Sequence, residues 1–98
     1  MSEPTKSIRI GPFDYELKVL PEMHFNGSVL WGRIEYPTAT IEIAERLQVP
    51  QREQTMWHEI LHALLTHAGM TLENEEMVVE MLSHGIVQVL RDNEGLMS

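Results

Sequence analysis

A short stretch of the chain carries two histidines and a glutamate at a spacing that can bind a metal ion. Residues His58-Glu59-Ile60-Leu61-His62 have the form H-E-x-x-H. Side chains four positions apart lie on one face of an α-helix, so His58 and His62 can share one Zn²⁺ ion. Glu59 can then act as general base on a water molecule at the metal. The pattern therefore indicates metal-assisted hydrolysis.

The residues around this motif have the periodicity of an amphipathic helix. At about 100° per residue, His58 and His62 lie about 40° apart on a polar side of the helix. A separate arc holds the apolar residues Trp57, Ile60, Leu61, Leu64, Leu65 and Ala68. Pro50 suits the first turn and Gly69 suits a C-terminal cap, so we expect a helix over residues 50–68.

A catalytic zinc site needs a third protein ligand and leaves its fourth position to water. His67 lies about 180° from His58 on the helical wheel, so we expect it at the surface or near the cap. The next amphipathic segment runs from about Asn74 to Arg91, and Glu76 and Glu80 border its apolar face. Because the connecting segment is short, the two helices should be neighbours, which would bring these carboxylates towards the histidines.

This second segment resembles the corresponding helix of the gluzincin type of zinc peptidase. In that family H-E-x-x-H is followed by a helix reading roughly N/E-E-x-x-x-D, and Glu75-Glu76-Met77-Val78-Val79-Glu80 is similar to it. The resemblance implies that Glu76 is the third zinc ligand and that Glu80 hydrogen-bonds His58, fixing the orientation of its ring. Here glutamate stands where the family usually has asparagine before the ligand and aspartate after it. The chain also resembles minigluzincins and small phage or prophage H-E-x-x-H proteins.

Other polar residues near the predicted site have roles that the sequence leaves open. Glu73 and Glu75 fit solvated carboxylates in the first turn of the second helix, where negative charge is favourable. Tyr36, His67 and His84 are candidate donors to the oxyanion of a reacting carbonyl, and the sequence does not choose among them.

The segments before the motif predict a small antiparallel sheet of three to four strands. Residues 7–20 alternate around Gly11-Pro12 as a β-hairpin, and residues 29–36 form a third strand. Gly32 within that strand indicates a bulge or a close backbone approach. Residues 40–44 form a short strand expected at the sheet edge, either as an ordinary edge or as a place where an extended peptide adds. The expected fold class is α+β, a sheet followed by two helices.

Composition limits the class of protein further. The chain has 98 residues, no cysteine, seven lysines and arginines and a net charge of −8. We expect one domain over residues 1–98, a metal held only by nitrogen and oxygen, and no nucleic-acid partner. No segment has the roughly 20 apolar residues of a membrane span. The first seven residues lack the apolar centre of a signal peptide, so we expect a cytoplasmic protein without a membrane partner.

These features favour a zinc-dependent hydrolase, and the resemblance implies a peptidase whose substrate is a peptide or protein of unknown identity. Two alternatives stay open. The chain is either a zinc-binding module that is non-catalytic or latent, or a phage or prophage interaction protein in which the motif is accidental. The sequence does not determine the cleavage preference or the oligomeric state.

Overall fold

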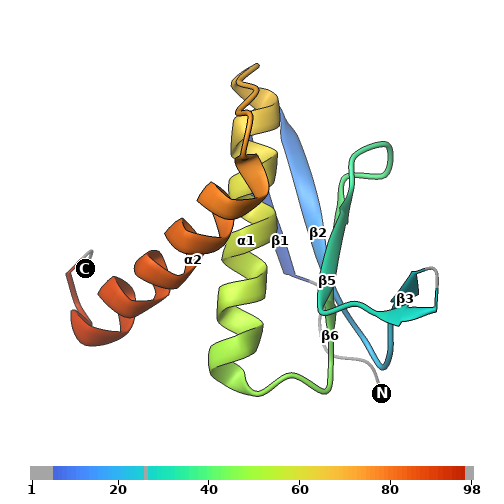
Figure 1. The fold of residues 1–98 in the computed structure, drawn as a ribbon, viewed down its shortest axis with the longest axis horizontal. Coiled ribbons are helices and arrows are strands. Elements are labelled where there is room, and N and C mark those ends of the chain that lie inside the picture. The colour runs from blue at the N-terminus through green and yellow to red at the C-terminus, as the bar shows by residue number, and fades with distance from the viewer. Residues whose placement is uncertain (1–5, 26, 97–98) are drawn as a thin grey trace.

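The protein has an α+β fold in the computed structural model, which describes residues 6–25 and 27–96 (Figure 1). Its elements in chain order are β1 (Lys6–Ile10), β2 (Phe13–Leu20), β3 (His24–Phe25), β4 (Ser28–Val29), β5 (Gly32–Glu35), β6 (Thr40–Ala44), α1 (Val49–His67) and α2 (Glu75–Asp92). One sheet has the strand order β1-β2-β6-β5, and β3 pairs with β4 separately. The predicted order, a small sheet followed by two helices, is confirmed.

The sheet is mixed, so the prediction of a purely antiparallel sheet is wrong at one strand pair. β1 runs antiparallel to β2 and β5 antiparallel to β6, but β2 and β6 are parallel, with Leu17 opposite Ile41. Parallel neighbours need a long crossover between them. Residues 21–39 supply it, because β3, β4 and β5 all lie between the two strands in the sequence.

β6 is an inner strand, which corrects the expectation that it forms the edge of the sheet. It lies between β2 and β5, and Ile41, Ile43 and Ala44 are buried. The edge on that side is β5. It covers only residues 32–35 of the strand predicted over residues 29–36, and Val29 belongs to β4. A short strand can be central when both its neighbours and the helix above it bury its side chains.

α1 packs on the sheet, and α2 packs on α1. The core joins Tyr15, Ile41 and Ile43 of the sheet to Ile60 and Ala63 of α1. Removing this apolar surface from water, at about 25 cal/mol per Å², is what holds the helix on the sheet. Within residues 6–25 and 27–96, α2 packs against no strand, and its carboxyl end runs away from the sheet (Figure 1).

The helix boundaries follow local sequence signals. Gln48 and Gln51 form a reciprocal capping box at the start of α1, and Pro50 lies in its first turn. Gly69, just beyond the end of α1, has a φ of 72°, which glycine adopts at low cost. The predicted boundaries of α1 are therefore confirmed to within one residue at each end, as are those of α2, which begins after Asn74.

His67 fixes the carboxyl end of α1 to the sheet. Its ring is half-buried and packs against Phe13, Tyr15 and Tyr36. The Tyr15 hydroxyl lies 2.6 Å from His67 Nε2. His67 thus lies in the last turn of the helix as predicted, but it faces the sheet and not the solvent.

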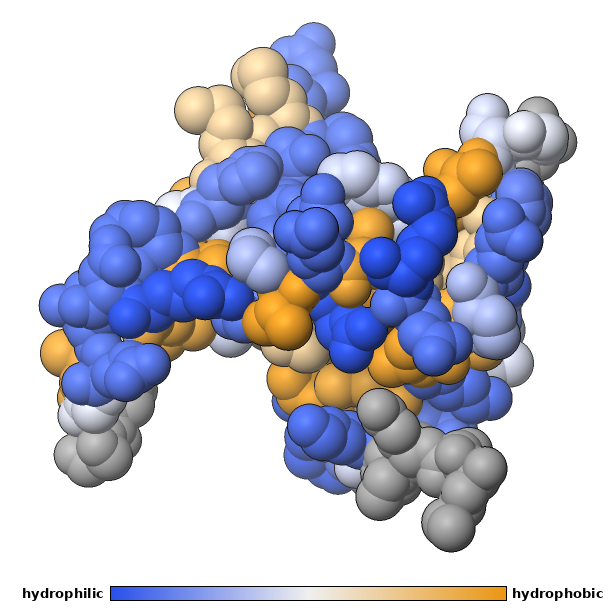
Figure 2. All heavy atoms as spheres, turned by 90° about the horizontal axis from the view of Figure 1, so that it is seen from below, coloured by the Kyte–Doolittle hydropathy of each residue, from blue (hydrophilic) through white to orange (hydrophobic). Residues whose placement is uncertain are grey.

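The outer surface combines charged residues with exposed apolar side chains. Figure 2 shows hydrophilic and apolar surface interspersed on one face, with α2 projecting as an arm on the left. Exposed apolar residues of α2 include Met81, Leu82 and Val89. Neither helix, within the described residues, is long and apolar enough to cross a membrane. Residues 1–5, which entered the expectation about a signal peptide, lie outside the described residues.

Candidate metal centre

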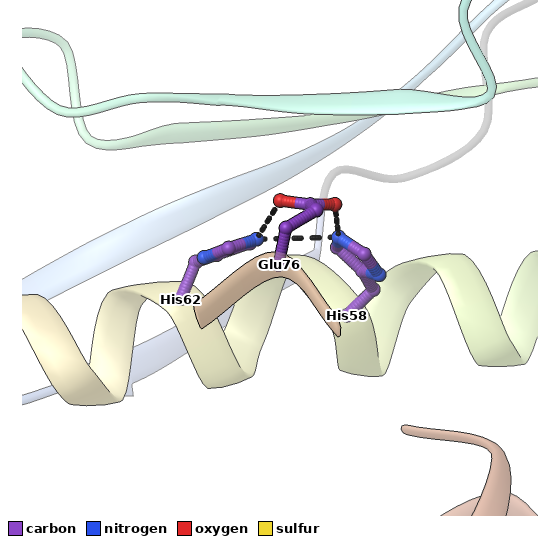
Figure 3. Close-up of side chains that lie close together, drawn as sticks. All are labelled: His58, His62 and Glu76. Atoms are coloured by element: carbon purple, nitrogen blue, oxygen red, sulfur yellow. Dashed lines mark hydrogen bonds and ion pairs between the residues drawn. The ribbon is translucent and has the colours of Figure 1, made fainter. Parts of the chain in front are cut away.

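His58, His62 and Glu76 converge on one point between the two helices (Figure 3). One carboxylate oxygen of Glu76 lies 2.7 Å from His58 Nε2, and the other lies 2.9 Å from His62 Nε2. The two Nε2 atoms are 3.2 Å apart. The three side chains thus form a group that could hold a metal ion, and they are the three predicted ligands.

Both helices are needed to build this group. The i, i+4 spacing places His58 and His62 on one face of α1, one turn apart. Glu76 lies in the first turn of α2, and the short connection over residues 68–74 places that turn beside the end of α1 (Figure 1). The backbone amide of Met70 donates to the Leu65 carbonyl within this turn.

Each histidine ring also contacts a second carboxylate through Nδ1, the ring nitrogen that does not face Glu76. His58 Nδ1 lies 2.9 Å from Glu80 Oε1, and His62 Nδ1 lies 2.7 Å from Glu75 Oε2. A carboxylate accepts hydrogen bonds, so Glu80 and Glu75 each stabilise a proton on Nδ1 of the ring that they contact. A neutral ring with its proton on Nδ1 keeps a bare lone pair on Nε2, and this is the form that binds metals.

The resulting donor set is unstable without a positive charge at its centre. If both rings are neutral and carry their proton on Nδ1, the two facing Nε2 atoms and the Glu76 carboxylate present only lone pairs to one another. Such groups repel at hydrogen-bond distance unless a proton or a cation lies between them. The chemistry of the donors therefore fits a bound cation. The Glu76 side chain is 75% exposed, so solvent reaches the group.

Glu75 is a residue whose role the sequence reasoning missed. It was expected to be a solvated first-turn carboxylate, but its side chain is only 29% exposed and it accepts the hydrogen bond from His62. Its position directly before Glu76 is the one signal that could have indicated this. Adjacent residues on a helix lie about 100° apart, so Glu76 can approach Nε2 while Glu75 reaches Nδ1.

Glu80 lies where the resemblance implied, beside His58. Burial alone would raise the pKa of Glu80, but hydrogen bonds from His58 and Gln54 outweigh it and lower the pKa below its usual value. A lowered pKa keeps the group ionised, and therefore an acceptor for the His58 proton, at neutral pH.

Glu59 points away from the solvent. It is 8% exposed, and burial raises its pKa, although the neighbouring His58 and His62 oppose the shift. Its carboxylate has no hydrogen-bond partner within residues 6–25 and 27–96. A buried, unpaired carboxylate with a raised pKa is more common at catalytic positions than in the structural core.

The three candidate oxyanion donors occupy different places. His67 faces the sheet, as described above, and His84 is an exposed residue of α2. The Tyr36 hydroxyl lies 3.0 Å from Thr66 Oγ1. Thr66 is one turn beyond His62 on α1 and shares its face of the helix. Of the three candidates, Tyr36 is therefore the one whose hydroxyl contacts the face that carries the two histidines.

No protein-family model, curated protein or solved structure gave a significant match to this chain. The interpretation of the site therefore depends on the side chains themselves: which of them converge, which are buried, and which proton each ring carries.

Proposed function

We propose that this protein is a zinc-dependent hydrolase that acts on peptide bonds. His58, His62 and Glu76 would hold the ion. The observation that carries the proposal is the convergence of two Nε2 lone pairs and one carboxylate, with each ring oriented by a further carboxylate. Such outer partners are typical of metal-binding histidines.

The donor set fits zinc better than other common metals. Imidazole nitrogen and carboxylate oxygen are both zinc ligands, whereas calcium and magnesium prefer oxygen alone. In a tetrahedral site with Zn–N bonds of about 2.0–2.1 Å, two nitrogens would lie about 3.3 Å apart. The two Nε2 atoms, at 3.2 Å, already have nearly this separation.

Zinc, when bound, would supply the Lewis acidity that polarises a carbonyl group and acidifies water. Glu59 would accept the proton of the attacking water and pass it to the leaving amine. Its burial suits this role, because a raised pKa brings a carboxylate closer to the value at which it can both take and return a proton near neutral pH. Tyr36 is the preferred candidate to donate a hydrogen bond to the oxyanion.

The free edge of β5 supports a peptide as the substrate class. Among the described strands β5 pairs only with β6, so its outer backbone groups are available to an extended chain. β5 also lies against the motif helix. A Cβ atom on Gly32 would be 2.5 Å from the Thr55 side chain and 3.8 Å from Glu59 Cγ. A peptide added to this edge would therefore run past the proposed general base.

Metal analysis of the purified protein tests the proposal. We expect about one zinc ion per chain in the wild type and little in His58→Ala or Glu76→Ala. His24→Ala is the matched control, because His24 is an exposed histidine of β3 that pairs with Glu22 and takes no part in the group. Equal zinc in all four proteins, or none in the wild type, would contradict the proposed site.

A peptide library with fluorescent reporters then separates catalysis from binding. Cleavage by the zinc-loaded wild type, and its loss on removal of the metal, is the expected result. Bound zinc without cleavage of any peptide would instead indicate the non-catalytic module.

A further inference from the structure

We infer that Gln54 is a positioning residue of the metal centre, which acts on His58 through Glu80. The inference rests on the proposed function, because it concerns the same site. Gln54 is 8% exposed and lies on α1 one turn before His58. A buried amide beside a metal-binding pair needs partners, and those partners are specific here.

One carboxylate oxygen joins Gln54 to the metal centre. Gln54 Nε2 donates to Glu80 Oε1 over 2.6 Å, and His58 Nδ1 donates to the same oxygen over 2.9 Å. Residues four positions apart on α1 thus bind one atom of α2. If the first donor were lost, the carboxylate could rotate and the ring of His58 would lose its fixed acceptor.

Ser83 determines which way the amide of Gln54 faces. Ser83 is fully buried, and its hydroxyl donates to the Glu80 backbone carbonyl over 2.8 Å. Its oxygen is therefore left to accept the hydrogen bond from Gln54 Nε2, over 3.1 Å. If the amide were turned over, its oxygen would face the Glu80 carboxylate, which can only accept, so the orientation with Nε2 towards Glu80 is the stable one.

Glu80 needs this support because of its length and exposure. Its side chain is 52% exposed and has one more rotatable bond than aspartate, so water and other rotamers compete with the position beside His58. A buried donor that is itself held by Ser83 reduces this freedom. Gln54 and Ser83 therefore hold Glu80 in place, and Glu80 in turn orients the ring of His58.

Zinc affinity and the spectrum of bound cobalt test this role. Gln54→Met keeps the length of the side chain but removes the donor. We expect roughly 10–100-fold weaker zinc binding, measured by competition with a chelating indicator, and a changed visible spectrum of bound Co²⁺, which reports ligand geometry. Ser83→Ala should weaken binding in the same direction but less, because Gln54 keeps one of its two partners.

The control is Gln88→Met, which makes the same change at an exposed glutamine of α2 whose side chain donates to Asp92, away from the metal centre. It should leave affinity and spectrum unchanged. If Gln54→Met lowers the melting temperature of the metal-free protein but alters neither affinity nor spectrum, Gln54 is only structural and the inference is wrong. If Gln54→Met does not fold, unchanged affinity and spectrum in Ser83→Ala overturn it instead. Failure of the wild type to bind zinc would refute the proposed function itself.

Discussion

Each motif histidine contacts two carboxylates, one at each ring nitrogen. His58 lies between Glu76 and Glu80, and His62 lies between Glu76 and Glu75. The outer carboxylates, Glu80 and Glu75, can accept hydrogen bonds from the Nδ1–H groups, which leaves the inner Nε2 atoms to bind a cation. All four contacts join α1 to α2, so a movement of either helix relative to the other would disturb every one of them.

Glu59→Gln is the informative change at the residue scale. We expect it to retain zinc, to abolish hydrolysis and to raise the melting temperature of the metal-free protein at neutral pH. Burial raises the pKa of Glu59, so the folded state disfavours its charged form and the carboxylate destabilises the fold as the pH rises through that pKa. A neutral amide of the same shape removes this cost.

The gain in stability should therefore disappear below the ordinary carboxyl pKa of 4.5, where glutamate is protonated in both folded and unfolded states. Thermal unfolding of both proteins across this pH range measures it. Glu45→Gln, at an exposed position after β6, should show no such change. Loss of zinc or of stability in Glu59→Gln would show that the carboxylate has a structural role.

Among the elements, α1 connects all the others. One of its faces packs on the sheet through Ile60 and Ala63, and another packs on α2. β5 approaches the helix closely because Gly32 has no side chain. This approach places the free sheet edge beside the motif, so the strand and the helix must be considered together.

Gly32→Ala tests this close approach. The added Cβ would lie 2.5 Å from Thr55 Cγ2 and 3.2 Å from the Glu42 carbonyl oxygen. Since Thr55 is buried, the strand or the helix has to shift, and we expect a loss of about 1–3 kcal/mol in the free energy of unfolding. Urea denaturation of the metal-free protein gives this value.

Gly85→Ala is the matched control for the Gly32→Ala substitution. A Cβ on Gly85 would meet no atom within 4 Å, and Gly85 lies inside α2. Alanine there should stabilise the protein by about 0.5–1 kcal/mol, because it restricts the unfolded chain and favours the helix. If the two substitutions had equal effects, the close packing of β5 on α1 would be in doubt.

At the scale of the whole molecule, α1 is the only helix or strand of the described part of the chain that α2 packs against. The contacts that join the helices include the ion pair between Arg91 and Glu53 and the group around Glu76. A metal ion bound there would tie the two helices together. Zinc should therefore affect the stability of α2 more than that of the sheet.

Removal of zinc should lower the melting temperature of the wild type clearly. Zinc at about one hundred times its dissociation constant would add about 2.7 kcal/mol, which corresponds to a shift of roughly 10 °C or more in a domain of this size. Calorimetry with and without a chelator measures the shift, and hydrogen exchange should show the largest loss of protection in α2. His62→Ala should not respond to the chelator. A response of equal size in that variant would show that the stabilising metal binds elsewhere.

The sequence by itself determined the two helices, their boundaries and the faces that carry the candidate metal ligands. His58 and His62 share a face because helical spacing is local, and Glu76 and Glu80 border the apolar face of the next helix for the same reason. A short connector between two such helices made it predictable that they would be neighbours, and the structure places the three expected ligands together.

Only the tertiary structure decided how distant segments meet. Periodicity could not show that β6 would lie inside the sheet and pair in parallel with β2, because pairing depends on the path of the intervening chain. The sequence could not predict the hydrogen-bond partners of Glu75 and Gln54 either. Hydrogen bonds between helices depend on the angle and depth at which they cross, and these are set by packing over the whole core and not by the spacing of residues along one segment.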